Sequence, residues 1–373
     1  MRVAIDARKL HDYGIGTYVR NLVSELARQD DDAEYVLLCA PADVAELAAL
    51  GPRFQPRIVR AGNYSAREQW SVPLSLAGAR VDLFHAPHYV VPPLTGRFVV
   101  TIHDCIHLRF PQYLPSRGAL YYARMMMTQA ARRSAKVLTV SQASKDDILH
   151  YLRVPSEKVE VIHNALDRRL ASEPTPEDVS RVRERFLLTS PYILYTGNIK
   201  PHKNVDRLIE AFSILRRGGF EDVKLLIIGD EISKYPNLRR LVHRFQLHQH
   251  VRFLGFVPDA TLAVLYRLAS VFVFPSLYEG FGLPPLEAMA AGAPVVTSNI
   301  SSLPEVVGDA ALLIDPMDAG AISAAMGRVL ADPQLRADLI RRGHERITAF
   351  SWERSVARVR QVYGELARKS THG

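Results

Sequence analysis

Two glutamates eight residues apart frame a glycine-rich loop, and they carry the strongest indication of chemistry in this sequence. Glu279 follows an apolar run that ends at Pro275, and Glu287 falls within the first turns of the helix that comes next. The loop places four backbone amides near the start of that helix: Gly280, Phe281, Gly282 and Leu283. Carboxylates and amides gathered at a helix start suit the hydroxyls of a sugar or a ribose.

A second segment offers positive charge. Thr196-Gly-Asn-Ile-Lys-Pro-His-Lys203-Asn204 follows another apolar run, and Lys200 and Lys203 come just before a predicted helix. Lysine side chains and helix-terminal amides that converge on one place would bind a diphosphate. The segment is not a P-loop, because Gly-x4-Gly-Lys-Ser/Thr is absent. Solvated lysines remain the alternative interpretation.

The loop after the first predicted strand contains Gly14 and Gly16, which would let a backbone approach a phosphate. A dinucleotide fingerprint requires a third glycine at position 19, where this chain has Val19. The pattern therefore disfavours an NAD-dependent oxidoreductase, and an ordinary tight turn stays open.

His103 and Asp104 end another apolar strand, where they would face a ligand. A buried histidine bonded to a backbone carbonyl is the alternative. Other histidines lie close in the sequence, namely His85, His88 and His107. Their spacing matches no known ligand pattern, so no metal site is predicted.

Short β-branched runs alternate with amphipathic stretches through the chain, which predicts parallel sheets covered by helices. The expected strands of the first half are Arg2–Asp6, Tyr35–Cys39, Arg57–Arg60, Val81–Ala86, Phe98–His103, Lys136–Val140 and Lys158–Ile162. Those of the second half are Tyr192–Thr196, Lys224–Gly229, Val251–Leu254, Val271–Pro275, Pro294–Thr297 and Ala311–Ile314. The polar, proline-containing segment 167–190 is expected to be a linker.

The domain boundaries follow from this alternation. We expect an α/β domain over residues 1–166, a second over 191–350, and a last helix within 351–373. Ligands bind at the carboxyl ends of parallel strands, so the expected site is a cleft between the domains.

Composition excludes several classes of protein. The chain has 373 residues, a net charge of +8 and two cysteines, too few for a disulfide framework or a cysteine-rich metal site. No apolar run approaches the length of a membrane span, and the start of the chain does not resemble a secretory signal. A cytoplasmic location is therefore expected. Nucleic-acid binding is disfavoured because no zinc-finger, helix-turn-helix or RNP pattern occurs.

With Glu279 and Glu287, the block Glu-Gly-Phe-Gly-Leu-Pro-x-Leu-Glu-Ala-Met-Ala resembles the E-x7-E signature of retaining glycosyltransferase family 4. Gly-Ile-Gly-x-Tyr near the start, Val140-Ser-x-x-Ser144 and Leu303-Pro-Glu-Val-Val-Gly also resemble this family, so the likeness covers essentially the whole chain. It implies a GT-B fold: two Rossmann-like doubly wound domains that face each other across a cleft, with a last helix that returns to the first domain.

The resemblance also implies roles for single residues. Glu287 would bind the ribose diol, and Glu279 with the Gly280–Leu283 amides would hold the donor sugar. Lys203 would neutralise the leaving diphosphate, His103 would lie beside the donor sugar and Gly16 near the phosphates, and the backbone around Val257 would contact the base. Many members have Gly-Arg where this chain has Gly197 and Asn198. Either Lys200 replaces that arginine, or one cation and helix amides suffice.

The implied reaction is transfer of a hexose from a nucleotide diphosphate sugar to a saccharide or a lipid-linked acceptor, with retention and without metal or other cofactor. The resemblance to bacterial polysaccharide mannosyltransferases favours GDP-mannose as donor. A UDP-sugar donor, a GT-B epimerase and a non-catalytic sugar-nucleotide-binding protein remain alternatives.

A basic stretch over residues 105–145 contains seven lysines and arginines and no carboxylate. Arg117, Arg124, Arg132 and Arg133 are interspersed with Leu120, Tyr121, Met125, Met126 and Met127. One interpretation is a helix that rests on anionic lipid headgroups at the inner face of the cytoplasmic membrane. The other is a helix whose methionines are core and whose arginines are solvated.

Overall fold

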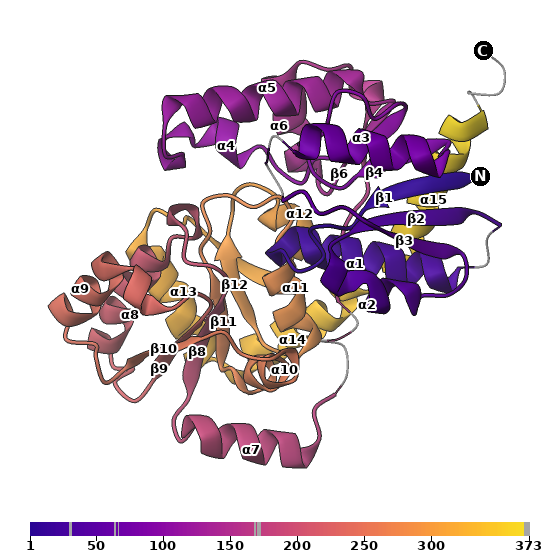
Figure 1. Cartoon of the computed structure of the whole chain (residues 1–373). Helices are drawn as coiled ribbons and strands as arrows, with labels where there is room; N and C mark the ends of the chain where they lie inside the picture. The colour runs from indigo at the N-terminus through magenta and orange to yellow at the C-terminus, as the bar shows by residue number, and fades with distance from the viewer. Residues whose placement is uncertain (30–31, 63–64, 66, 168, 170–172, 369–373) are drawn as a thin grey trace. The chain divides into compact units, whose positions relative to one another are not determined.

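The computed structural model describes residues 1–29, 32–62, 65, 67–167, 169 and 173–368 (Figure 1). The chain divides into two compact units. Unit 1 is Met1–Asn164 together with the segment from Ser351 on, and unit 2 is Ala165–Phe350. Each unit is a parallel sheet covered by helices.

The sheet of unit 1 has seven parallel strands in the spatial order β3-β2-β1-β4-β5-β6-β7. Their bounds are β1 (Arg2–Asp6), β2 (Glu34–Cys39), β3 (Phe54–Ile58), β4 (Leu83–Ala86), β5 (Phe98–Thr101), β6 (Lys136–Thr139) and β7 (Val159–Val161). The strand order reverses between β1 and β4, as in a doubly wound fold. Both edges of the sheet are short strands, and Pro56 lies in the edge strand β3, where a missing N–H is tolerated.

Helices cover both faces of this sheet. They are α1 (Tyr13–Arg28), α2 (Val44–Ala48), α3 (Glu68–Ala79), α4 (Ile106–Arg109), α5 (Arg117–Arg133), α6 (Gln142–Leu152) and α15 (Trp352–Arg368). One core joins α3, α5 and α6 to one sheet face, through side chains such as Val72, Met127 and Ile148. The last helix, α15, packs against α1, and its buried Tyr363 hydroxyl bonds to His85 Nδ1 in β4.

The sheet of unit 2 repeats the reversed order with six parallel strands, β10-β9-β8-β11-β12-β13. These are β8 (Tyr192–Thr196), β9 (Lys224–Ile228), β10 (Val251–Gly255), β11 (Val271–Phe274), β12 (Val295–Ser298) and β13 (Ala311–Ile314). The helices are α7 (Pro176–Phe186), α8 (Val205–Arg217), α9 (Pro236–Arg244), α10 (Asp259–Leu268), α11 (Leu283–Ala290), α12 (Leu303–Val307), α13 (Ala319–Ala331) and α14 (Pro333–Ile347). The reversal falls between β8 and β11, the two strands that precede the lysine segment and the glycine loop.

The predicted α/β fold class is confirmed, with differences at element ends. The third strand lies at Phe54–Ile58 rather than Arg57–Arg60. The segment expected to be a linker, 167–190, contains α7, which begins with a capping box between Thr175 and Asp178 and packs against α10. The strongly polar sequence of α7 concealed its two buried residues, Val182 and Phe186. Residues 168, 170–172 and 369–373 of these expected segments lie outside the described residues.

Candidate active site

Lys203 and Glu279 meet at the strand reversal of unit 2. Lys203 ends a short 3-10 helix (Pro201–Lys203) after β8, and Glu279 lies in the loop after β11. Lys203 Nζ lies 2.6 Å from Glu279 Oε1, and the two side chains are only 13% and 12% exposed. The same ammonium group lies 5.2 Å from the centre of the Phe274 ring. In a doubly wound fold this reversal is where ligands bind, so the pair stands in the expected place.

Asn204 fixes the backbone next to Lys203. Its φ of 60° lies in the left-handed region, which asparagine tolerates better than most residues. Its buried amide donates to the carbonyl of Pro275 at 3.0 Å and to that of Pro316 at 2.7 Å. The loop after β8 is therefore tied to the loops after β11 and β13, which holds Lys203 close to Glu279.

Two serines hold the glycine loop, and the sequence analysis did not identify them. Ser301 Oγ accepts from the Glu279 amide at 3.1 Å and donates to the Glu279 carbonyl at 2.8 Å. Ser302 Oγ donates to the Phe281 carbonyl at 2.7 Å. Two serines before Leu303 and Pro304 were a helix-start signal that could have been used.

Gly282 is the loop position that requires glycine. It has a φ of 109°, and a Cβ added there would lie 2.7 Å from Leu303 Cδ2. Gly280 is half-buried, Phe281 is buried, and Leu283 begins α11. The loop therefore turns tightly into the helix, as the sequence predicted.

Glu287 projects from α11 toward a buried tyrosine. Tyr266 Oη donates to Glu287 Oε2 at 2.8 Å and lies 2.6 Å from Thr196 Oγ1 at the end of β8. Burial raises the pKa of Glu287 to about 7, and the carboxylates of Asp167 and Asp259 act in the same direction. The carboxyl group therefore titrates near neutral pH.

Arg169 partly offsets the negative charge of Asp167, Asp259 and Glu287. It forms ion pairs with Asp167 at 2.8 Å and with Asp259 at 3.0 Å, and its positive charge favours the ionised form of Glu287. The three residues come from the start of unit 2 and the first turn of α10, so spacing in the sequence gave no sign of them.

The remaining predicted residues of unit 2 are Val257, Lys200 and Asn198. Val257 is buried in the loop between β10 and α10, and the preceding Phe256 is 81% exposed. Lys200 is exposed. The carbonyl of Asn198 accepts from Tyr195 Oη at 3.1 Å, whereas its buried Oδ1 has no hydrogen-bond partner within the described part of the chain.

His103 follows β5 in unit 1. Its Nε2 lies 3.0 Å from the Pro87 carbonyl, so Nε2 carries the proton in the neutral ring. Tyr18 of α1 contacts the ring edge-on, with 4.9 Å between ring centres. Burial lowers the pKa of His103 to about 4, which keeps the ring neutral at physiological pH.

Gly16 differs from the expectation of an open phosphate loop. Helix α1 begins at Tyr13, so Gly16 lies in its first turns and not in an open loop. Its amide donates to the Asp12 carbonyl at 2.7 Å. A Cβ there would lie 2.5 Å from the Leu10 carbonyl oxygen. The glycine therefore allows close backbone packing, and its amide is already used.

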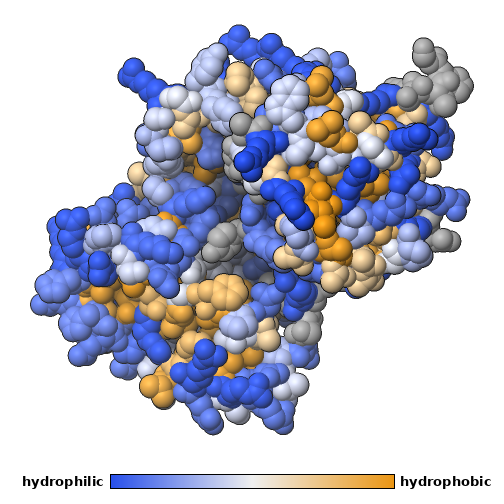
Figure 2. All heavy atoms as spheres, viewed as in Figure 1, coloured by the Kyte–Doolittle hydropathy of each residue, from blue (hydrophilic) through white to orange (hydrophobic). Residues whose placement is uncertain are grey.

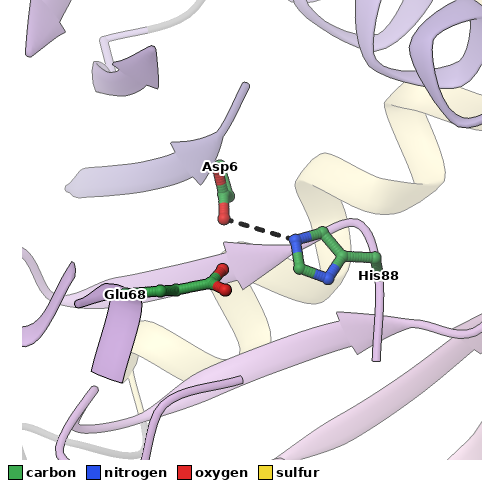
Figure 3. Close-up of side chains that lie close together, drawn as sticks. All are labelled: Asp6, Glu68 and His88. Carbon is green, nitrogen blue, oxygen red and sulfur yellow. Dashed lines mark ion pairs between the residues drawn. The ribbon is translucent and has the colours of Figure 1, made fainter. Parts of the chain in front are cut away.

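One group of three residues with the ligand types of a metal site occurs among the described residues: Asp6, Glu68 and His88 (Figure 3). A cation already stands between the two carboxylates, because Arg8 Nη2 lies 2.6 Å from Asp6 Oδ2 and 2.6 Å from Glu68 Oε1. Burial alone would raise the pKa of Asp6, but Arg8 holds it well below its usual range.

The proton on His88 also disfavours a metal. Its Nδ1 accepts from the Val90 amide at 3.2 Å, so the neutral ring carries its proton on Nε2. That nitrogen lies 3.4 Å from Asp6 Oδ2 (Figure 3). A metal on Nε2 would require the proton to move to Nδ1, which would break the bond to Val90. We interpret the cluster as a buried ion-pair network that holds the start of the first loop.

Comparison with known proteins agrees with this geometry. Residues 176–346 match the family model "Glycosyl transferases group 1", and residues 13–170 match "Glycosyltransferase Family 4". The O-antigen chain mannosyltransferase B of Escherichia coli is 33% identical over 83% of this chain and 81% of that protein. The serotype-specific mannosyltransferase WbdA of Escherichia coli is 31% identical over 68% of this chain, but the match spans only 32% of that longer protein.

Among solved structures, Alr3699/HepE from Anabaena, in complex with UDP and glucose, has a TM-score of 0.78 and 20% identity. The match covers 98% of this chain and all of that chain, and it supports the GT-B fold. The two family matches join near residue 170, close to where unit 2 begins. This chain is a glycosyltransferase and belongs to the family 4 glycosyltransferases of the GT-B fold.

Proposed function

We propose that this enzyme transfers mannose from GDP-mannose to a saccharide or lipid-linked saccharide during assembly of a surface polysaccharide, with retention of anomeric configuration. The observation that carries the proposal is the Lys203–Glu279 pair at the strand reversal of unit 2, in a chain similar to O-antigen mannosyltransferases. Glu279 and the loop after it would bind the sugar hydroxyls. Glu287 would bind the ribose diol, and Val257 would line the base site.

Lys203 would carry the main catalytic effect, because the bond to the diphosphate breaks in the transition state and negative charge grows on the leaving group. The family resemblance implies an arginine at the position of Asn198 in many members, so we assign this charge to Lys203 and to helix-terminal amides rather than to two cations. Lys200 is exposed, and we keep it as a second candidate for contact with the phosphates.

His103 would accompany the donor sugar as a neutral hydrogen-bonding group. With Nε2–H committed to Pro87, its Nδ1 is the ring atom left to accept from a sugar hydroxyl. Gly16 would act by allowing α1 to start close to the first loop, rather than by donating its amide to phosphate.

We propose that no metal and no other cofactor is required. In the one metal-like triad of the described residues, Arg8 already pairs with both carboxylates, and Lys203 supplies positive charge in the candidate donor site. Full activity in the presence of a chelator is the expected result. Loss of activity on chelation, restored by a divalent cation, would contradict it.

No helix of the described residues is long and apolar enough to cross a membrane. We propose a cytoplasmic enzyme that contacts the anionic inner face of the membrane through α5. The arginines of α5 are exposed, whereas Met126 and Met127 are buried in the core. The methionines of this stretch are therefore partly structural, and its basic side chains remain candidates for lipid contact.

A panel of nucleotide sugars tests the donor. Without acceptor, we expect slow release of GDP from GDP-mannose and none from UDP-sugars. Release of UDP instead would indicate a UDP-sugar-dependent transferase. Conversion of the sugar without nucleotide release would indicate an epimerase, and tight binding without turnover would indicate a non-catalytic protein.

A further inference from the structure

Helix α3 presents an apolar ridge to solvent. Trp70 and Leu74 are 68% and 71% exposed, and they lie one turn apart on the same side of the helix. From residue 69 to residue 79 the helix has no charged side chain. Large apolar side chains exposed together are unusual on a monomer surface and commonly mark a contact surface.

The same layer of unit 1 contains the basic helix α5. The inner sides of α3 and α5 share one core, in which Val72 and Leu76 accompany Met127 and Ala130. Both helices therefore lie on one face of the sheet (Figure 1). The loop that leads into β5 joins this layer, because Arg133 bonds to the Pro93 carbonyl, next to the 68% exposed Leu94.

We define the α3–α5 face by its exposed side chains: Trp70, Leu74, Leu94, Arg117, Tyr121, Arg124, Arg132 and Arg133. None of the ion pairs found within the described residues involves its four arginines. Aromatic and aliphatic side chains beside uncompensated arginines are the composition of a surface that contacts both lipid chains and lipid phosphates.

We infer that the α3–α5 face binds an anionic lipid bilayer, with Trp70 and Leu74 entering the boundary between headgroups and acyl chains. The inference extends the membrane contact proposed above for α5, and it names the residues that insert. A second copy of this chain would fit poorly, because an isologous contact would bring the same arginines together. A bilayer containing phosphatidylglycerol supplies both the negative charge and the apolar depth.

The tryptophan content allows a direct test. The chain has two tryptophans, Trp70 and the 5% exposed Trp352. In the full-length variant Trp352→Phe, Trp70 is the only tryptophan, so the tryptophan fluorescence comes from Trp70 alone. We expect its emission to shift to the blue, and to be quenched by brominated acyl chains, when vesicles of phosphatidylglycerol and phosphatidylcholine are added. Pure phosphatidylcholine vesicles should give neither effect.

Matched variants separate the apolar and the charged contributions. The double variant Trp70→Ser/Leu74→Ser should reduce binding to the anionic vesicles at least tenfold. Leu187→Ser, at a 73% exposed leucine of unit 2, should leave it unchanged. Replacement of Arg117, Arg124 and Arg132 by Gln should reduce the salt dependence of binding, because only Arg133 of the four arginines then remains on the face.

The inference is wrong if the protein sediments with vesicles while Trp70 is not quenched, or if the serine double variant binds as well as the wild type. It is also wrong if no binding occurs. If Trp352→Phe does not fold, the wild-type chain serves, because bromine reaches only the exposed tryptophan. Release of nucleotide from the donor in vesicle-free solution should be equal in all these variants, so failure of the membrane contact is distinguishable from failure of the proposed reaction.

Discussion

Lys203 Nζ lies 2.6 Å from Glu279 Oε1, although 76 residues separate them in the chain. Without substrate, the cation assigned to the leaving diphosphate and the carboxylate assigned to the sugar therefore satisfy each other. A bound donor would bring phosphate oxygens to Lys203 and sugar hydroxyls to Glu279. The pair keeps both charges in place within a largely buried site.

This coupling predicts non-additive stability. Each single change, Lys203→Met or Glu279→Gln, leaves one partly buried charge without its partner and should cost about 1–3 kcal/mol. The double variant should lose less than the sum of the two, because neither charge remains. Chemical denaturation of all four proteins measures this cycle. Strictly additive losses would show that the ion pair does not couple the two residues.

Glu287 predicts a pH dependence of donor affinity. Its pKa is raised to about 7, mainly by burial, so the carboxylate that accepts from ribose hydroxyls is formed only as the pH rises through neutrality. We expect the donor KM to rise about tenfold between pH 8 and pH 6, with no such rise in Glu287→Gln. A donor KM that is flat over this range in the wild type would refute the assignment.

The raised pKa of Glu287 also makes the folding stability depend on pH. The folded state retains the Glu287 proton to higher pH than the unfolded state, so stability falls as the pH rises from 4.5 to 7. Glu287→Gln should remove a penalty of at most about 3 kcal/mol at pH 8 and should unfold at a higher temperature there. An unchanged melting temperature at pH 8 would contradict this expectation.

The lowered pKa of His103 predicts the opposite change of folding stability with pH. Burial lowers its pKa to about 4, whereas the unfolded chain binds that proton near pH 6.5, so stability is lost as the pH falls from 6.5 toward 4. His103→Gln should lessen this acid-induced loss by about 2–3 kcal/mol at most. His248→Gln, at an exposed histidine, is the control and should not change it. Equal acid sensitivity of wild type and His103→Gln would argue against a buried neutral ring.

Two glycine-to-alanine changes should have opposite effects. Gly282→Ala meets both a φ of 109° and the Leu303 side chain, and it should cost about 1–3 kcal/mol. Gly364 lies inside α15 with no atom within 4 Å of an added Cβ, so Gly364→Ala should gain about 0.5–1 kcal/mol. Thermal unfolding of the two variants measures the contrast. A Gly282→Ala variant as stable as the wild type would show that the loop is not strained.

The sequence predicted the structure best where local patterns decide it, as in alternating apolar runs and in loops rich in glycine and proline. Alternation of apolar runs located every strand of both sheets, although the third strand begins three residues earlier than expected. The Glu279 loop was found because glycines and prolines punctuate the chain there. The helix α7 was missed because few of its residues are apolar, and its buried face depends on contacts with α10.

Contacts between segments that are distant in the chain could not be predicted from the sequence. Nothing in the spacing shows that Asn204 ties three loops together or that Tyr266 bonds to Glu287. The pairing of Arg169 with Asp167 and Asp259 is likewise set by folding of the sheet. The Gly16 amide was expected to be available, but the helix begins early enough to use it.

Calorimetric titration of two variants tests the central claim, which is that Lys203 serves the diphosphate and Glu279 the sugar of one bound donor. The ligands are GDP-mannose and GDP, or the corresponding pair if the hydrolysis panel identifies another donor. Glu279→Gln should bind GDP as the wild type does but GDP-mannose at least tenfold more weakly. Lys203→Ala should weaken both by a similar factor. Wild-type affinity of Glu279→Gln for GDP-mannose, or equal weakening of both ligands in that variant, would contradict the account.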